Sequence, residues 1–188
     1  IVTKDGYIFI AWDPAIPNQM PEQDVTYTAQ WKANSYSIAF NSNGGNGSIA
    51  NQEFTYDTPQ NISSNSFTKD GYIFVGWNTA NDGSGISYTD GQNVNNLTAS
   101  NNGTITLYAQ WEKMYTVNEA WDLIDGGTPP AEKVYVRGRV SNIEEISTTY
   151  GNATYYITDF TGEKPLYVYR GKYLNNAKFS SEEELKLN

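Results

Sequence analysis

The chain has 188 residues, of which 14% are aromatic, and it contains neither cysteine nor histidine. This excludes disulfides, Ser-His and Cys-His catalytic pairs, and zinc sites of the usual kind. The formal net charge of −9 disfavours nucleic acid as a partner, and the apolar runs fall short of the roughly 18 residues that a membrane span needs.

The first predicted elements belong to a sequence that occurs twice. Residues 3–12 and residues 68–77 agree at all but two positions, and a second shared motif closes each copy. In both copies a Lys-Asp-Gly turn leads into alternating Tyr-x-Phe-x-x-Trp and then a return strand, which is typical of half-buried β-strands. We expect the tryptophans that end these strands to lie in cores, with sugar-stacking rings as the alternative: Trp12, Trp31, Trp77 and Trp111.

Another alternating strand lies between the copies, at residues 36–40, and ends in a glycine-rich turn. A complete module is therefore predicted over residues 35–112, and residues 1–33 are predicted to be the C-terminal half of a preceding module. Because the chain begins inside a repeat, we expect it to be part of a longer protein.

The second copy carries 15 more residues between its two tryptophans than the first, and the extra segment lies within residues 78–105. This segment is rich in Asn, Gly, Ser, Thr and Asp, which is typical of turns and exposed hairpin tips. We therefore expect residues 78–105 to form a long hairpin or loop with little contact to the rest of the module. Deleting residues 80–94 would then leave the module folded.

The motifs Tyr-x-Ile-x-Phe-x-x-Asn-Gly-Gly, Lys-Asp-Gly-Tyr-x-Phe-x-Gly-Trp and Leu-Tyr-Ala-Gln-Trp follow one another in this order. Together they resemble the Listeria/Bacteroides repeat, the family of the internalin B-repeats, over residues 1–112. The resemblance implies small β-grasp-like modules, strung in arrays on surface proteins as stalk or adhesion elements. It also implies an extracellular or bacterial cell-surface location.

After the second copy the pattern changes to that of a different small domain. Residues 116–127 are predicted to form one helix, capped by Thr116 or Asn118 and stopped by glycine. Three alternating strands follow, separated by turns that contain glycine: residues 134–140, 153–159 and 166–170.

These strands carry the motifs Val-Tyr-Val-Arg-Gly-Arg-Val, Tyr-Gly-Asn-Ala-Thr-Tyr-Tyr-Ile-Thr-Asp and Leu-Tyr-Val-Tyr-Arg-Gly. With the helix, they resemble the OB-like domains of exported Bacteroides proteins over residues 114–188. An OB barrel needs further strands, so we expect either that this domain is truncated or that those strands are replaced. The predicted fold class is mainly β: β-grasp-like repeat modules plus an α+β, OB-like C-terminal domain with one N-terminal helix.

One face of these strands is the candidate ligand site. Alternation puts valines on one side and aromatic or basic side chains on the other, outside the core. OB folds bind oligonucleotides and oligosaccharides on such a face, and the small number of basic residues favours a glycan or a host or cell-surface protein. The alternative is that they are ordinary cross-strand partners on a solvated sheet. The residues are Tyr135, Arg137, Arg139, Tyr167 and Tyr169.

No catalytic residue, metal ligand or cofactor is predicted. Asp82 and Asp90 lie in turns that lack the terminal Glu of a calcium loop. Glu144 and Glu145 are interpreted as a solvated strand end rather than a glycosidase pair. The sequence therefore predicts a non-catalytic cell-surface or secreted protein whose repeats act as a stalk or adhesion spacer. The alternative is a glycan- or protein-binding module that uses the OB-like face.

Overall fold

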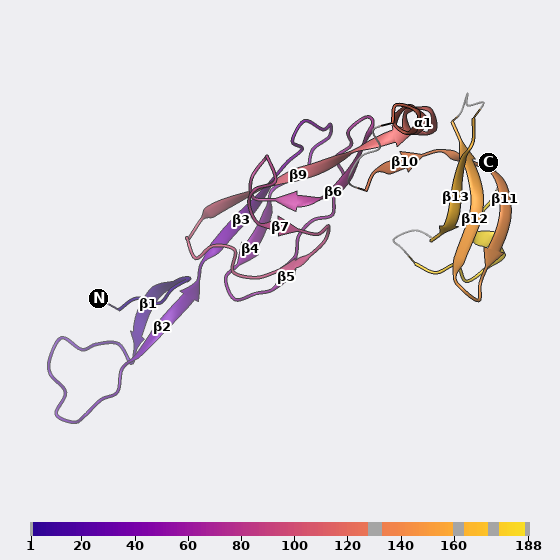
Figure 1. Cartoon of the computed structure of the whole chain (residues 1–188). Helices are drawn as coiled ribbons and strands as arrows, with labels where there is room; N and C mark the ends of the chain where they lie inside the picture. The colour runs from indigo at the N-terminus through magenta and orange to yellow at the C-terminus, as the bar shows by residue number, and fades with distance from the viewer. Residues whose placement is uncertain (1, 128–132, 160–163, 173–176, 187–188) are drawn as a thin grey trace. The chain divides into compact units, whose positions relative to one another are not determined.

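The computed structural model describes residues 2–127, 133–159, 164–172 and 177–186 (Figure 1). The chain divides into two compact units, which comprise Ile1–Asp70 with Phe74–Trp111 and Gly71–Ile73 with Glu112–Asn188. Strands dominate both units, and α1, Val117–Asp125, is the one α-helix among the described residues. The prediction of a mainly β fold is confirmed.

The first unit begins with an antiparallel hairpin of β1, Tyr7–Asp13, and β2, Thr28–Ala33. Phe9 lies opposite Trp31 in the register. The Phe9 ring packs against Trp12 and Trp31, with ring centroids 5.4 and 5.7 Å apart. These are the two strands that the repeated motif predicts.

The second repeat is built on a sheet with strand order β4-β3-β9-β6-β7 (Figure 1). β3 and β9 run parallel at its centre, and β4 runs antiparallel to β3. Two short strands, β5 and β8, pair with each other. The sheet therefore mixes parallel and antiparallel pairs. The strands are β3 Ser35–Asn41, β4 Gln52–Thr55, β5 Gln60–Asn61, β6 Tyr72–Asn78, β7 Ser87–Tyr88, β8 Asn93–Val94 and β9 Gly103–Thr116.

The core of the second repeat is centred on Trp77, whose side chain is 0% exposed. Its ring meets Phe40 and Phe74 at centroid distances of 5.0 Å and Phe67 at 6.0 Å, all in edge-on geometry. Such pairs add to the free energy gained by burying the rings. The buried cluster consists of Tyr36, Ile38, Phe54, Ile62, Phe67, Trp77, Val94, Leu107 and Ala109.

The four repeat tryptophans differ in their burial. Trp77 is fully buried, as predicted, whereas Trp12, Trp31 and Trp111 are half-buried. Trp111 also donates a hydrogen bond of 2.8 Å from Nε1 to the carbonyl of Ser42. None of the four rings is exposed in the way that a sugar-stacking tryptophan requires.

The prediction that residues 78–105 make little contact with the module is wrong. Val94 is buried in the core cluster, and Tyr88 and Leu97 pack against that cluster. β7 pairs with β6, and β8 pairs with β5. The physical reason is that the parallel strands β3 and β9 need a long crossover, and this segment supplies the last part of that crossover and covers the core.

Asn78 explains why a segment so rich in polar residues can pack tightly. Its side chain is buried, at 1% residue exposure. Nδ2 donates to the carbonyls of Gly83 and Gly85, at 3.0 and 3.3 Å, and to Ser87 Oγ at 2.9 Å. Oδ1 accepts from the amides of Ala80 and Gly85, at 2.8 and 3.0 Å. One amide side chain thus replaces the backbone pairing that the turn lacks.

Replacing Asn78 with alanine is expected to lower the free energy of unfolding by about 2 kcal/mol, because buried backbone groups lose their partners. Urea unfolding followed by circular dichroism measures this loss. Asn81→Ala is the matched control, since its side chain is exposed in the same turn. We expect the control to stay within about 0.5 kcal/mol of the parent. Equal losses in the two variants would contradict this role for Asn78.

In the second unit, α1 begins as predicted, with Thr116 as the N-cap. The Thr116 side chain accepts from the amide of Glu119 at 3.2 Å, and the Glu119 carboxylate accepts from the amide of Thr116 at 2.9 Å. The Asp159 carboxylate accepts from the amides of Val117 and Asn118, at 2.7 and 2.8 Å. These bonds satisfy amides that the first helical turn leaves without partners.

Where the structure describes the rest of the second unit, it consists of four strands and a short 3-10 helix. β10 runs parallel to the end of β9, and β11, β12 and β13 form an antiparallel sheet in that order. This sheet does not by itself establish the OB-like fold, which stays a prediction. The elements are β10 Tyr135–Arg137, β11 Arg139–Ser147, β12 Asn152–Thr158, β13 Leu166–Gly171 and the 3-10 helix Glu182–Glu184.

Candidate functional site

The five residues of the predicted ligand face lie on two different sheets. Tyr135 and Arg137 belong to β10, which pairs with β9. Arg139 opens β11, whereas Tyr167 and Tyr169 lie on β13. Tyr135 is half-buried and the other four are exposed. The structure therefore divides the five residues between two sheets, and only the last three share one.

Gly138 lies where the chain passes from one sheet to the other. A Cβ at Gly138 would lie 2.8 Å from Cγ2 of Val117 and 3.0 Å from Cβ of Ile157. The glycine thus allows the backbone to approach α1 and β12 closely, at the point where the chain leaves β9 and joins β12. The alternating pattern of residues 134–140 continues across this change of partner, so the sequence predicts one strand where the structure has two.

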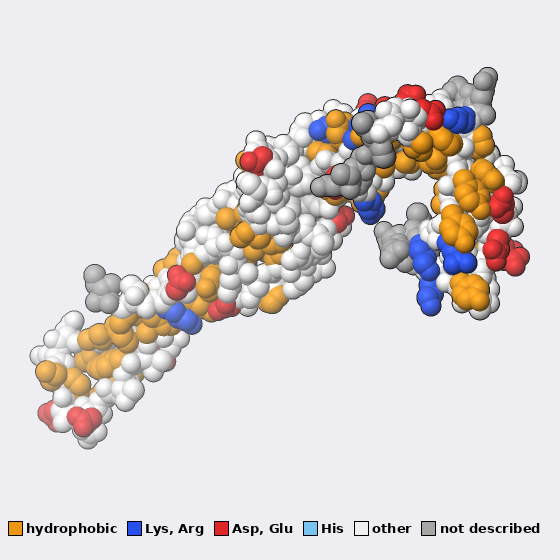
Figure 2. Space-filling view, in the orientation of Figure 1, with side chains coloured by type: hydrophobic (Ala, Val, Ile, Leu, Met, Phe, Trp, Pro, Cys, Tyr) orange, Lys and Arg blue, Asp and Glu red, His pale blue; other side chains and the backbone are white. Residues whose placement is uncertain are grey.

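Three tyrosines form a continuous row on one face of the β11–β13 sheet, which we call the tyrosine ladder: Tyr156, Tyr167 and Tyr169. Tyr156 lies opposite Tyr167, with ring centroids 4.9 Å apart. Tyr167 and Tyr169 stack at 6.3 Å with an interplanar angle of 27°. Tyr167 is 46% exposed and Tyr169 is 62% exposed. Figure 2 shows hydrophobic side chains interspersed with charged ones over this sheet.

Two charged residues accompany the tyrosine ladder. The hydroxyl of Tyr167 donates to Glu144 Oε2 at 3.1 Å, and the guanidinium of Arg170 lies over the Tyr169 ring at 5.1 Å. Arg170 has a φ of +52°, a left-handed conformation that non-glycine residues adopt only at a cost. Sequence reasoning missed Tyr156 and Glu144. Alternation along β12, which puts Tyr156 on the same face as Thr154 and Thr158, was the available signal.

The pKa values of Tyr156 and Tyr167 in the tyrosine ladder are raised, so both phenols stay protonated near neutral pH. Partial desolvation raises the pKa of Tyr167, and its hydrogen bond to Glu144 raises it further. Desolvation and the nearby charge of Glu144 likewise raise the pKa of Tyr156. The ladder therefore presents aromatic rings with hydroxyl groups, flanked by the carboxylate of Glu144 and the guanidinium of Arg170.

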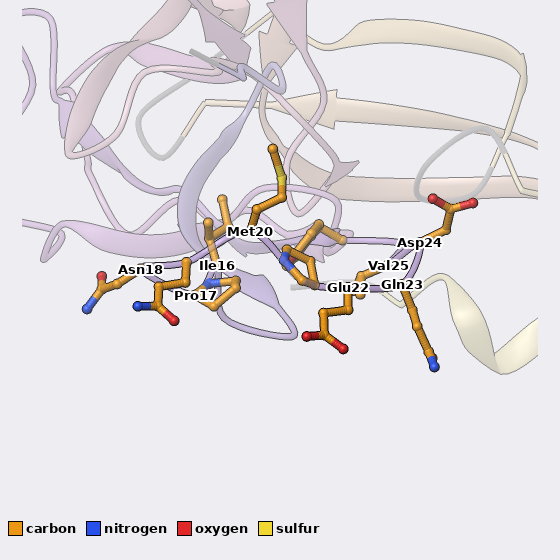
Figure 3. A pocket seen from close by; sticks show the side chains of 11 residues that line it. Ile16, Pro17, Asn18, Met20, Glu22, Gln23, Asp24 and Val25 are labelled. Atoms are coloured by element: carbon orange, nitrogen blue, oxygen red, sulfur yellow. The ribbon is translucent and has the colours of Figure 1, made fainter.

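A separate hollow lies in the loop between β1 and β2. Its lining residues are consecutive or nearly so, from Ile16 to Val25 with Tyr27 (Figure 3). Met20 is 93% exposed and Ile16 is 61% exposed. A hollow made by one exposed loop brings no distant side chains together, so we do not regard it as a binding site.

The turn that contains Asp82 in the second repeat is closed by hydrogen bonds to this side chain. The Asp82 carboxylate accepts from both the amide and the hydroxyl of Ser84, at 3.0 and 2.7 Å. The hydrogen bond from the hydroxyl, followed by that from the amide, lowers the pKa of Asp82. Within the described residues no group of three or more Asp or Glu side chains is arranged to hold a metal ion. The carboxylate therefore closes a turn.

Residues 36–110 match the family model of the Listeria-Bacteroides repeat domain. Internalin H of Listeria monocytogenes serovar 1/2a is 34% identical over 123 residues, which cover 59% of this chain and 20% of that protein. A protein of Evansella cellulosilytica, provisionally named a Gly-rich membrane protein, is 29% identical over 192 residues, 92% of this chain and 20% of its own length. The chain thus spans about a fifth of the length of these relatives.

A second Evansella cellulosilytica protein, provisionally named a membrane protein, is 31% identical over 121 residues, 57% of this chain and 17% of that protein. No solved structure matches the chain. Among the described residues, no helix combines the length and the apolar character needed to cross a membrane.

Proposed function

We propose that the chain is a non-catalytic part of a bacterial surface protein in which tandem repeats act as a spacer. The basis is the match of residues 36–110 to the Listeria-Bacteroides repeat domain. The observation that carries this proposal is the connection between the repeats. β2 ends at Ala33 and β3 begins at Ser35, so Asn34 is the whole linker. The names of the relatives, an internalin and a membrane protein, support a surface location.

A one-residue linker suits a spacer because it leaves little freedom between successive repeats. Asn34 is buried at 7% exposure, and its Nδ2 donates to the carbonyl of Ala99 at 2.6 Å. A flexible tether would instead use a run of exposed Gly and Ser residues. The linker is thus part of the packed unit.

The location is tested by protease treatment of intact cells that produce the natural full-length protein. An antibody raised against residues 36–110 follows the digestion. We expect the epitope to disappear from intact cells, while a cytoplasmic marker survives. An epitope that disappears only after lysis would overturn the surface location and, with it, the spacer proposal.

A second candidate function is glycan binding by the tyrosine ladder. The observation that favours it is the pair of stacked, exposed rings of Tyr167 and Tyr169, next to hydrogen-bonding groups of Glu144 and Arg170. Flat aromatic faces with polar groups at their edges suit the alternating apolar and hydroxyl surfaces of sugars. With few cations nearby and a net charge of −9, a neutral glycan fits better than an anionic polymer.

We expect the double variant Tyr167→Ala, Tyr169→Ala to weaken binding to neutral oligosaccharides by at least about tenfold, since stacking on one ring contributes roughly 1–3 kcal/mol in nucleic-acid complexes. A glycan array identifies the oligosaccharide, and calorimetry measures its affinity. Tyr150→Ala is the matched control, because this ring is 72% exposed but lies outside the tyrosine ladder. Unchanged affinity in the double variant, or an equal loss in the control, would remove the ladder from consideration.

A further inference from the structure

The Lys-Asp-Gly-Tyr motif has the same backbone geometry in both copies but different surroundings. Gly6 and Gly71 have φ values of +75° and +74°. The amide of Asn34 donates to the carbonyl of Gly6 at 2.8 Å, and the amide of Met114 donates to that of Gly71 at 2.9 Å. A Cβ on Gly71 would have no atom of the described residues within 4 Å, whereas a Cβ on Gly6 would overlap the ring of Tyr56.

Tyr56 and Asp57, which we call the docking turn, belong to the repeat that follows Gly6. They come directly after β4, and Asp57 has a φ of +60°. The Tyr56 ring packs edge-on against Tyr7 at 5.8 Å, and the Tyr7 hydroxyl donates to Asp57 Oδ2 at 2.6 Å. The amide of Tyr56 donates to the carbonyl of Asn34 at 2.9 Å. The contact therefore combines rings, a charge-assisted hydrogen bond and backbone pairing.

The docking turn is held in place by its own repeat. Asn96 Oδ1 accepts from the amide of Asp57 at 2.6 Å, and Asn96 Nδ2 donates to Asp57 Oδ1 at 2.6 Å. Asn96 also has a left-handed φ, of +53°. Because these bonds fix the carboxylate before the preceding hairpin meets it, little ordering is needed to form the contact.

The charges at the contact are complementary at neutral pH. The hydrogen bond from Tyr7, followed by that from Asn96, lowers the pKa of Asp57, and the positive charge of Lys4 lowers it further. The bond to Asp57 raises the pKa of Tyr7. Lys4 Nζ itself lies over the Tyr7 ring at 3.6 Å from its centroid. Asp57 is therefore the ionised acceptor, and Tyr7 keeps the proton that it donates.

We propose that the Lys-Asp-Gly-Tyr motif is a docking site for the next repeat in the tandem, and that the partner it recognises is a Tyr-Asp turn after the second strand of that repeat. The contact fixes the orientation of one repeat against the next. This inference rests on the spacer function proposed above. It gives the motif a role in positioning the next repeat, in addition to forming a turn. Glycine is required at residue 6 by the Tyr56 ring as well as by its φ.

The test compares Gly6→Ala with Gly71→Ala in the 188-residue chain, because alanine meets the same backbone conformation at both sites but a ring only at residue 6. Hydrogen exchange of the amides of Asn34 and Tyr56 reports on the contact directly. We expect exchange of the Asn34 amide about tenfold faster in Gly6→Ala, the effect of losing one hydrogen-bonded contact, and no change in Gly71→Ala in the exchange of the Met114 amide, which bonds to Gly71.

The orientation of the hairpin is measured separately by electron paramagnetic resonance. Since the chain has no cysteine, Gln30→Cys and Glu53→Cys place one spin label on β2 and one on β4. We expect a single narrow distance distribution in the labelled parent and in Gly71→Ala, and a broad one in Gly6→Ala.

Equal effects of Gly6→Ala and Gly71→Ala would overturn the docking site, because backbone strain alone would then explain both. Gly6→Ala combined with Tyr56→Ala is expected to behave like Tyr56→Ala alone, since removing the ring removes the overlap, and additive effects would also overturn it. If Gly6→Ala fails to fold, Tyr7→Phe tests the hydroxyl contact alone. The two proposals can fail separately. If the docking test fails but protease removes the epitope from intact cells, the spacer function stands and the joint between the repeats is flexible.

Discussion

Replacing Trp77 with alanine is expected to lower the free energy of unfolding of the second repeat by about 3–5 kcal/mol, the cost of removing a fully buried aromatic side chain. Trp77 packs against Phe40, Phe67 and Phe74. Its Nε1 has no hydrogen-bond partner among the described residues, so packing alone holds the ring. Since small domains are stable by only about 5–15 kcal/mol, the variant repeat would be partly unfolded near body temperature.

Thermal and urea unfolding followed by circular dichroism measure this loss. Trp12→Ala is the matched control, because Trp12 occupies the same place in the first copy of the motif but is half-buried and packs on the ring of Phe9. We expect the control to lose well under half as much. A similar loss in both variants would mean that the two copies bury their tryptophans equally in solution.

Deleting residues 80–94 is expected to unfold the second repeat. The deletion removes β7 and β8 together with the buried side chain of Val94. It also removes every hydrogen-bond partner of the buried Asn78 side chain. Burying a valine contributes about 1.5–3 kcal/mol, and an amide left without partners costs about 1–3 kcal/mol. The combined loss is of the same order as the stability of a small domain.

The measurement is the dispersion of the amide signals in a two-dimensional NMR spectrum, which separates a folded repeat from an unfolded one. The control deletes residues 17–24, in the loop that joins β1 and β2, whose apolar side chains include the 93% exposed Met20. We expect the control to keep the signals of the second repeat. A folded repeat after deletion of residues 80–94 would mean that this segment is a loop that the core does not need.

Local signals were sufficient for some elements. The capping residues of α1, Thr116 and Glu119, lie three positions apart in the sequence, and the helix begins where they predict. The repeated motif likewise predicts the hairpin of β1 and β2, because alternation of side chains within one strand is a local property. The exposure of Tyr167 and Tyr169 follows from the same alternation along β13.

The candidate site was only partly predictable. Three of the five predicted residues share a sheet, but the tyrosine ladder also includes Tyr156, which comes from the neighbouring strand β12. Glu144 reaches Tyr167 from β11, 23 positions earlier in the sequence. Which side chains meet across strands depends on the register, and the bulges in β11 shift that register in a way that alternation alone does not reveal.

By itself, then, the sequence determined the repeated strands, the capped helix and the mainly β class, because each depends on neighbours along the chain. Only the tertiary structure decided that the segment around Val94 enters the core, since burial there requires the parallel strands β3 and β9 to come together from distant positions. It also decided the different surroundings of Gly6 and Gly71, which have the same motif and the same φ. Identical local sequences acquire different roles when the chain that packs against them differs.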